Sequence, residues 1–298
     1  MSTTRERNLT AEALAVMEGS DADRINYIRQ DKFILYKAAS EILADLKDLL
    51  THPPRHRMPC RLIIAETNNG KTNLIRKFIE LHPGDPNVDG ECIKLPIIHV
   101  ELVEPDDKHL YQQILKAVFA DFPPKGNASE RREQALTILK KIKPKLLIID
   151  EANNIISGSV NKQRACLNAI KHISNEAGIS VVATGTEAAV HGFRTDSQIE
   201  NRFENRYLPK WNDGRDLISF LSTYEGNLPL KEKSRIWQDS MRSIILLRSE
   251  GTIGEIAKFL EAAAIYAIRN KIEQITPEVL NACGYVSPKA RRMGTQLR

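Results

Sequence analysis

The chain has 298 residues, of which 42% are hydrophobic and 27% charged, and this composition is ordinary for a globular protein. Its net charge of +5 permits contact with a polyanion but does not by itself indicate one. No apolar run approaches the roughly 18 residues that a membrane span needs, and the polar N-terminus lacks the apolar core of a signal peptide. The four cysteines are scattered and form no C-x-x-C pair, which argues against zinc and disulfide frameworks and leads us to expect a cytoplasmic protein.

Residues 1–57 are predicted to form an N-terminal helical extension. From Asp21 apolar residues recur at helical spacing, and one stripe consists of Ile42, Leu43, Leu46, Leu49 and Leu50. Three prolines in THPPRHRMP, residues 51–59, then end the helical pattern. Because these prolines prevent a helix that would align His52 with His56, we expect no function for that histidine pair.

Between residues 58 and 211, predicted strands and helices alternate. The predicted strands are Arg61–Ala65, Leu95–Leu102, Leu146–Ile149 and Ile179–Thr184. The predicted helices are Lys71–Leu81, Asp106–Phe119, Arg131–Ile142 and Lys162–Ala177. Apolar strands separated by amphipathic helices are typical of a parallel sheet covered on both faces, so we expect an α/β core.

Residues 212–298 contain no predicted strand. The predicted helices are Asp213–Tyr224, Glu232–Ser249, Ile253–Asn270 and Thr276–Ala282. The chain ends in SPKARRMGTQLR, which has four basic residues and no acidic one, and such a charge run is most often a solvated tail. We therefore expect a small helical domain with a basic tail after the core.

A phosphate-binding loop is indicated by AETNNGKT, which differs at one position from G-x-x-x-x-G-K-[ST]. In this pattern backbone N–H groups and the start of a helix surround the phosphates, Lys71 reaches the β- and γ-phosphates, and the Thr72 hydroxyl binds Mg²⁺. Ala65 replaces the first glycine, which is costly only where that position needs a positive φ. The predicted nucleotide contacts are Ala65, Glu66, Thr67, Asn68, Asn69, Gly70, Lys71 and Thr72.

Two carboxylates, Asp150 and Glu151, follow the predicted strand Leu146–Ile149 in the segment LLIIDEAN. Asp150 at the end of this strand is predicted to hold Mg²⁺, and Glu151 to orient or deprotonate the attacking water. Alone, an apolar strand ending in Asp-Glu could simply begin a surface loop. After a phosphate-binding loop and in this order, the pair indicates an ATP or GTP site.

Two further segments carry candidate residues. The strand in ISVVATGTEAA ends in Thr184, Gly185 and Thr186, so a polar side chain there, beside the Asp150 strand, could touch the γ-phosphate or the water, or could belong to an ordinary turn. In TDSQIENRFENRYLP, Arg202 and Arg206 would share one face of a helix, and either could reach the nucleotide of a neighbouring subunit. Surface charge is the alternative, and it is the stronger one for Arg206.

Four segments, RMPCRLIIAETNNGKTNLIRKF, LLIIDEANNIISGSVNKQRACLNAIKHISNE, ATGTEAAVHGFRTDSQIENRFE and LRSEGTIGEIAKFLEAAAIYAI, together resemble the TniB family from about Asp23 to Ile275. TniB proteins are AAA+ ATPases of bacterial transposons, similar to TnsC-type regulators. The resemblance implies an AAA+ P-loop fold with a parallel core sheet flanked by helices and a C-terminal helical lid, with ATP and Mg²⁺ bound between subunits. It also implies self-assembly into a ring or helical filament on double-stranded DNA, and recruitment of a DDE transposase and a TniQ-type targeting protein.

Carried over by position, the resemblance makes Gly70, Lys71 and Thr72 the Walker A residues and Asp150 and Glu151 the Walker B residues. Thr186 matches sensor 1, and Arg202 is the arginine finger. The chain departs from the pattern at Ala65 and in GTIGEIAKFL, where many AAA+ proteins have a sensor-2 arginine and this chain has Glu255 and Lys258. Lys258 is the substitute candidate.

DNA contact is expected through basic residues that touch the phosphate backbone without sequence preference, since no base-reading motif is present. The candidates are Lys108, Lys162, Arg164 and Lys171, each of which could instead be part of an ordinary solvated helix face. A helicase loader or replication initiator, a small-molecule P-loop kinase and a DNA scaffold with slow hydrolysis are the alternative functions.

Overall fold

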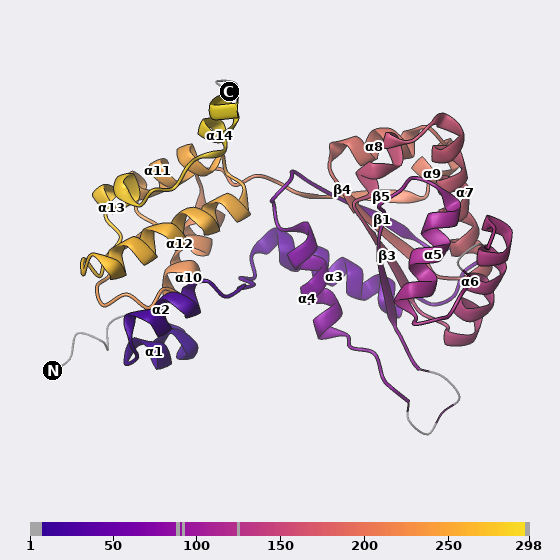
Figure 1. The fold of residues 1–298 in the computed structure, drawn as a ribbon, viewed down its shortest axis with the longest axis horizontal. Helices are drawn as coiled ribbons and strands as arrows, with labels where there is room; N and C mark the ends of the chain where they lie inside the picture. The colour runs from indigo at the N-terminus through magenta and orange to yellow at the C-terminus, as the bar shows by residue number, and fades with distance from the viewer. Residues whose placement is uncertain (1–7, 88–89, 91–92, 124–125, 296–298) are drawn as a thin grey trace. The chain divides into compact units, whose positions relative to one another are not determined.

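The computed structural model describes residues 8–87, 90, 93–123 and 126–295, which form two compact units (Figure 1). One unit contains residues 38–208, and the other contains the described residues up to Lys37 together with those from Pro209 onward. The described part of the extension predicted for residues 1–57 is thus divided between the two units. Cys92 and Arg298 lie outside the described residues.

A five-stranded parallel sheet forms the centre of the 38–208 unit, in the order β2-β3-β4-β1-β5. Its strands are β1 Cys60–Ala65, β2 Ile97–Glu101, β3 Leu146–Asp150, β4 Ser180–Gly185 and β5 Phe203–Leu208. The four predicted strands are confirmed, and β5 is an addition. It lies at the sheet edge, where polar side chains such as Glu204 and Asn205 are usual.

Helices cover both faces of this sheet, with α3 and α4 on one side and α5, α6 and α7 on the other (Figure 1). Leu62 and Ile64 belong to the large core that β1 shares with α5, α6 and α7, whereas Ile63 between them points to the opposite face. The helices are α3 Lys37–Thr51, α4 Lys71–Leu81, α5 Asp107–Ala117, α6 Ala128–Ile142, the 3₁₀ helix η2 Ala152–Ser157, α7 Val160–Ala177, α8 Glu187–Arg194 and α9 Ser197–Glu200.

The second unit is helical and is built around α12, a helix with one almost wholly buried face. Ile28 of α2 joins this core, so residues from the N-terminal part of the chain pack with the C-terminal helices. The helices are α1 Ala11–Met17, α2 Asp21–Ile28, α10 Arg215–Gly226, α11 Asp239–Ser249, α12 Ile253–Arg269, α13 Pro277–Ala282 and α14 Pro288–Thr295. In the described part of the chain no helix is both long and apolar enough to cross a bilayer.

Two predictions for the helical unit are wrong in detail. The helix expected from Glu232 begins at Asp239, because the Glu225 carboxylate accepts backbone hydrogen bonds from Ser234, Arg235 and Ile236 and holds them in a loop. The basic tail is not merely solvated. It forms α14, whose Arg291 bonds to the buried carboxylate of Glu255.

Candidate nucleotide-binding site

The phosphate-binding loop joins β1 to α4 at the carboxyl edge of the sheet, where α/β proteins bind ligands. Asn68 and Gly70 adopt left-handed backbone conformations, with φ of 61° and 85°. Glycine suits the second position because it has no Cβ, and asparagine is among the residues that best tolerate the first. Ala65 is still part of β1 and has no positive φ, so the glycine that it replaces is not needed for the turn.

Lys71 is the first residue of α4, and its side chain folds back over the loop. Its Nζ donates hydrogen bonds to the carbonyl oxygens of Ala65 at 2.8 Å and Glu66 at 3.0 Å. Burial lowers the pKa of the ammonium from its ordinary value, against the opposing influence of Glu151, Asp150 and Glu66. The loop therefore encloses a buried positive charge of the kind that phosphate oxygens bind.

Asn69 links the same loop to the neighbouring edge strand. Its buried side-chain amide donates a hydrogen bond of 2.8 Å to the carbonyl oxygen of Leu208, the last residue of β5. Its backbone N–H bonds to the carbonyl oxygen of Glu66 at 3.2 Å, while the side chains of Glu66 and Thr67 are exposed. Asn69 thus has a structural contact that the motif alone does not predict.

Asp150, at the end of β3, accepts hydrogen bonds from hydroxyl groups on two other elements. Thr72 Oγ1, on α4, donates to Asp150 Oδ2 at 3.1 Å, and Thr184 Oγ1, on β4, donates to Oδ1. A threonine hydroxyl beside a carboxylate is the oxygen donor set that Mg²⁺ prefers. The residues at this edge therefore fit a magnesium ion accompanied by phosphates.

Glu151 follows in a left-handed conformation, with φ 55° and ψ 39°, which is uncommon for a residue other than glycine, asparagine or aspartate. Its carboxylate accepts a hydrogen bond from Asn153 Nδ2 at 3.2 Å. The oxygen of the same Asn153 amide accepts the backbone N–H of Thr186 at 3.4 Å. One asparagine therefore connects the predicted catalytic carboxylate to the start of α8.

Thr184 is the residue of the β4 end that touches Asp150. It is fully buried, and it follows Ala183, which pairs with Ile149 immediately before Asp150. Thr186, the predicted sensor, is half-buried, and its hydroxyl does not cap α8. The sequence signal for Thr184 was available, because it stands at the end of a strand next to the Asp150 strand.

Arg202 lies at the amino ends of the strands, whereas the phosphate-binding loop lies at their carboxyl ends. It precedes Phe203, which pairs with Cys60 at the start of β1, so the length of β1, about 20 Å, separates its level from the loop. Its Nη2 donates to Asn175 Oδ1 at 2.8 Å, and within the described residues its buried Nη1 has no hydrogen-bond partner. Arg202 therefore lies far from the phosphate-binding loop of its own chain.

Arg206 does not share a helix face with Arg202, because it lies within β5. Its Nε bonds to Asp45 Oδ2 at 2.9 Å, and Arg61 Nε approaches the same oxygen at 2.7 Å. The two guanidinium groups thus share one carboxylate of α3. This arrangement assigns Arg206 to the packing of α3 against the sheet edge.

The four candidate DNA contacts fall into separate places. Lys108 is exposed at the start of α5, and Lys162, near the start of α7, lies 3.6 Å from the carboxylate of Asp106, which caps α5. Lys171 is nine residues further along α7, or about 14 Å, and its Nζ bonds to Gln198 at 3.1 Å. Arg164 is exposed on α7. The structure therefore places Lys162 beside the start of α5, where Lys108 lies, and Lys171 about 14 Å further along α7.

In the helical unit, Glu255 is 5% exposed and accepts hydrogen bonds from Tyr285 Oη, at 2.7 Å, and Arg291. Lys258 is exposed, and its Nζ lies 3.7 Å from the other Glu255 oxygen. Glu255 thus anchors the end of the chain to α12. Of the two residues in the sensor-2 segment, only Lys258 has its charged group at the surface.

Several solved structures have this fold at low sequence identity. The ORC1 protein of Aeropyrum pernix in complex with DNA is 16% identical, with a TM-score of 0.60 over 87% of this chain and 68% of that chain. Drosophila ORC bound to DNA is 13% identical, with a TM-score of 0.59 over 98% and 72% of the two chains. Cdc6p of Pyrobaculum aerophilum is 14% identical, with a TM-score of 0.57 over 85% and 69%.

These likenesses and the parallel sheet show the AAA+ P-loop ATPase fold predicted from the sequence. No curated protein matches the sequence. The family described as "Bacterial TniB protein" matches residues 24–213, which is more than half of the chain. The chain therefore belongs to the TniB family.

Proposed function

We propose that this TniB-family protein is a cytoplasmic, ATP-dependent regulator of DNA transposition. It binds ATP and Mg²⁺, assembles on double-stranded DNA without sequence preference, and recruits a DDE transposase and a TniQ-type targeting protein. The observation that carries the ATPase part is the convergence of Lys71, Thr72 and Asp150 at one edge of the sheet. Family membership supports the role in transposition, and the likeness to two proteins solved with DNA supports DNA binding.

Each residue of the candidate site has a role in binding or hydrolysis that matches its charge and its position. The backbone N–H groups of the loop and the Lys71 ammonium hold the phosphates, while Thr72 and Asp150 would hold Mg²⁺. Bound there, the ion neutralises phosphate charge. Glu151 orients the attacking water and accepts its proton, and the Asn153 amide, which donates to its carboxylate, holds that carboxylate in position.

The position of Arg202, at the end of the sheet opposite the loop, supports assembly through a shared site. In a ring or filament of identical subunits stacked head to tail, one subunit's loop edge can face the next subunit's Arg202 edge. Arg202 then acts as an arginine finger on its neighbour's γ-phosphate, and Thr186 serves as sensor 1 within the subunit. Lys108 and Lys162, joined by Arg164 and Lys171 elsewhere on α7, supply phosphate-backbone contacts to the DNA.

Two variants test the proposal in one assay that measures phosphate release and DNA binding together. Lys71→Ala should lose ATP-dependent DNA binding, because the buried charge that binds the phosphates is gone. Glu151→Gln should bind ATP, release little phosphate and stay longer on DNA, because only the base is removed. Normal phosphate release by Glu151→Gln would move the catalytic role to another residue.

The same assay separates two of the alternative functions, the kinase and the scaffold, from the regulator. A small-molecule P-loop kinase would release or transfer phosphate at a rate that duplex DNA does not change. A DNA scaffold would assemble with ATP in the wild type without measurable turnover. Stimulation of wild-type turnover by DNA, together with loss of assembly in Lys71→Ala, is the result expected for the regulator.

A further inference from the structure

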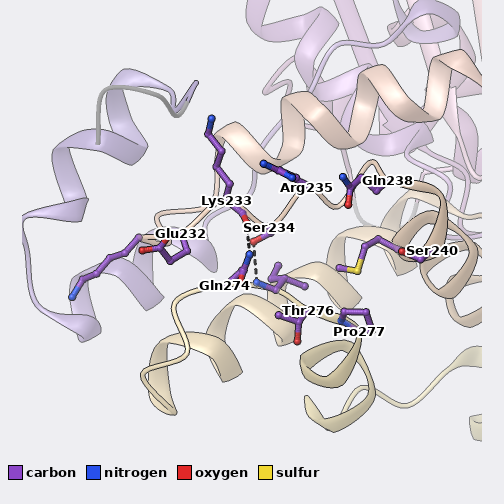
Figure 2. Close-up of a pocket in the computed structure, with 12 residues that line it drawn as sticks. Glu232, Lys233, Ser234, Arg235, Gln238, Ser240, Gln274, Thr276 and Pro277 are labelled. Atoms are coloured by element: carbon purple, nitrogen blue, oxygen red, sulfur yellow. Dashed lines mark hydrogen bonds between the residues drawn. The ribbon is translucent and has the colours of Figure 1, made fainter. Parts of the chain in front are cut away.

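The helical unit contains a polar hollow of about 540 Å³ whose walls bond to each other (Figure 2). The N–H of Ile275 donates to Ser234 Oγ at 2.9 Å, and the side-chain amide of Gln274 donates to the carbonyl oxygen of Lys233 at 2.6 Å. The side chains of Lys233 and Arg235 point away from Gln274 in Figure 2. The basic side chains of this region are therefore not directed into the hollow.

A denser group of basic side chains lies on α14, which carries Lys289, Arg291 and Arg292 and no acidic residue. Each residue from Lys289 to Gly294 is exposed, so this part of the helix buries no apolar side chain. Arg291 and Arg292 keep 46% and 65% of their side-chain surface accessible. Because a helix of eight residues is marginal on its own, polar contacts must hold α14 in place.

Two carboxylates, which we call the clasp, supply such contacts. Arg291 Nη2 bonds to Oε2 of Glu255, in the first turn of α12. Arg292 Nη2 donates to Glu250 Oε1 at 2.6 Å, and this bond lowers the pKa of Glu250. Burial alone would raise the pKa of Glu255, but the hydrogen bonds from Arg291 and Tyr285 outweigh it and hold that pKa below its ordinary value. Both carboxylates are thus charged at neutral pH and neutralise the two arginines.

Glu250 has a backbone conformation that is costly for a glutamate. It ends α11 with φ 53° and ψ 24°, in the left-handed region where glycine is the usual residue. Its contacts must offset that cost, and the bond from Arg292 is one of them. The carboxylate also lies beside the backbone N–H of Lys289, so one side chain holds both the first turn of α14 and Arg292.

Release of Arg291 would leave Glu255 with other partners. Tyr285 Oη donates to Glu255 Oε2 at 2.7 Å, and Lys258 Nζ lies 3.7 Å from Oε1. Tyr285 is held separately, because Arg248 bonds to its carbonyl oxygen. The chain up to Tyr285 can therefore stay in place while α14 leaves the clasp.

DNA phosphates are ligands that can replace the clasp carboxylates. Arginine binds carboxylate and phosphate oxygens through the same pair of parallel N–H donors. Three basic side chains within residues 289–292 suit duplex DNA, which carries one negative charge per about 1.7 Å of helix axis. An acidic protein segment usually adds an apolar anchor that fits a pocket, whereas residues 289–294 stand exposed on the surface of a helix.

We propose that α14 is a masked contact for duplex DNA, whose phosphates replace the clasp as the partner of Arg291 and Arg292. This inference rests on the proposed DNA-binding function and gives the helical unit a part in it. DNA and the clasp compete for the same two guanidinium groups. Removing the arginines should therefore weaken DNA binding, and removing a clasp carboxylate should strengthen it.

The first comparison is of full-length wild type with Arg291→Ala/Arg292→Ala and with a matched control, Arg29→Ala/Arg269→Ala. The control removes the same charge from exposed residues of the same unit. Fluorescence anisotropy with a labelled duplex of random sequence, in a non-hydrolysable ATP analogue, gives the affinity at several salt concentrations. Each lost phosphate contact lowers the slope of log affinity against log salt concentration by about 0.9, so the α14 variant should lose about 2 in slope, and the control much less.

The second comparison opens the clasp and leaves the buried Glu255 intact. Glu250→Gln should raise the affinity for DNA about two- to fivefold, the range expected when a surface ion pair no longer competes. Glu278→Gln, an exposed residue of α13, makes the same change in charge and should have little effect. In the Arg291→Ala/Arg292→Ala background, Glu250→Gln should have no more effect than Glu278→Gln. This coupling separates the clasp from a change in net charge.

Three results would overturn the inference. Equal losses of slope in the α14 variant and its control would leave net charge as the cause. A gain from Glu250→Gln that persists without the two arginines would show that the clasp does not mask them. Poly-glutamate that binds wild type more tightly than the duplex does at equal salt, and the α14 variant weakly, would make an acidic protein the ligand. The proposed function fails, in contrast, if wild type itself does not bind DNA with the analogue.

Discussion

The Asn153 side chain spans two parts of the candidate nucleotide site, because its Nδ2 lies 3.2 Å from Glu151 Oε2 and its Oδ1 lies 3.4 Å from the backbone nitrogen of Thr186. Gly185 also packs closely against Asn153. A Cβ added at Gly185 would lie 3.2 Å from Asn153 Oδ1 and 2.8 Å from Ala189 Cβ. Glycine at 185 thus lets the asparagine reach the start of α8.

Asn153→Leu should lower the kcat for ATP about tenfold and leave KM within about twofold, because Glu151 loses the donor that fixes its orientation while the phosphate contacts stay. Asn153→Gln, which keeps an amide, should recover part of the loss. Ser157→Ala, in the same 3₁₀ helix, is the control, since Ser157 Oγ donates to the Asn154 carbonyl oxygen at 2.7 Å and not to Asn153 or Glu151. A rise in turnover in Asn153→Leu would show that the amide restrains Glu151 instead of positioning it.

Thr184→Val should lower the free energy of unfolding by about 1–2 kcal/mol, because a buried hydroxyl that donates to Asp150 is replaced by a methyl group. Thr186→Ala should change it by less than about 0.5 kcal/mol, since this half-buried hydroxyl makes no capping bond. Urea unfolding of both variants measures the difference. If Thr186 is sensor 1, its variant will lose turnover at nearly unchanged stability, and normal turnover would transfer the sensor role away from it.

Asp45→Asn should destabilise the protein by about 1–3 kcal/mol at neutral pH, because Arg61 and Arg206 lose the carboxylate that they share. Burial alone would raise the pKa of Asp45, but the hydrogen bonds and charges of Arg61 and Arg206 outweigh it and hold the pKa below its usual value of 3.8. Below pH 3.8 the unfolded chain therefore binds more protons at this site than the folded chain, and the stabilisation is lost as pH falls through the lowered pKa.

Unfolding of wild type and Asp45→Asn at a series of pH values checks this prediction. The difference between their free energies of unfolding should be largest above about pH 5 and should shrink as the solution becomes more acidic. Asp48→Asn, on the same helix and without a bonded arginine among the described residues, is the control and should show no such trend. A difference that stays constant down to pH 3 would rule out the shared ion pair as its source.

The sequence predicts what depends on local pattern. Apolar runs locate four strands, and the two motifs that contain Lys71 and Asp150 locate the candidate nucleotide site, because each of these signals lies within one segment of chain. The sequence does not reveal β5, since FENRYL is mostly polar and becomes a strand through pairing with β1. The contacts of Thr184 with Asp150 and of Glu225 with the loop before α11 are missed for the same reason: each joins residues that only the fold brings together.

Arg202→Ala tests whether the nucleotide site is shared between subunits. The monomer should still bind ATP nearly as well as wild type, because Arg202 lies at the far edge of the sheet from Lys71 and Thr72. Hydrolysis and ATP-dependent oligomerisation should fall, the rate by about 10³-fold if Arg202 acts as an arginine finger. Arg206→Ala is the matched control, and it should reduce stability more than turnover, since its guanidinium is bound to Asp45.

Mixing the variants distinguishes action on a neighbour from action within one subunit. Lys71→Ala subunits cannot bind nucleotide but still carry Arg202, so adding them to Arg202→Ala subunits should restore part of the phosphate release. Each restored site would combine the loop of one subunit with the arginine of the next, as the separation of the two edges of the sheet requires. If the mixture stays inactive and Arg206→Ala also hydrolyses normally, neither arginine acts across a subunit boundary, and the proposal of a shared site fails.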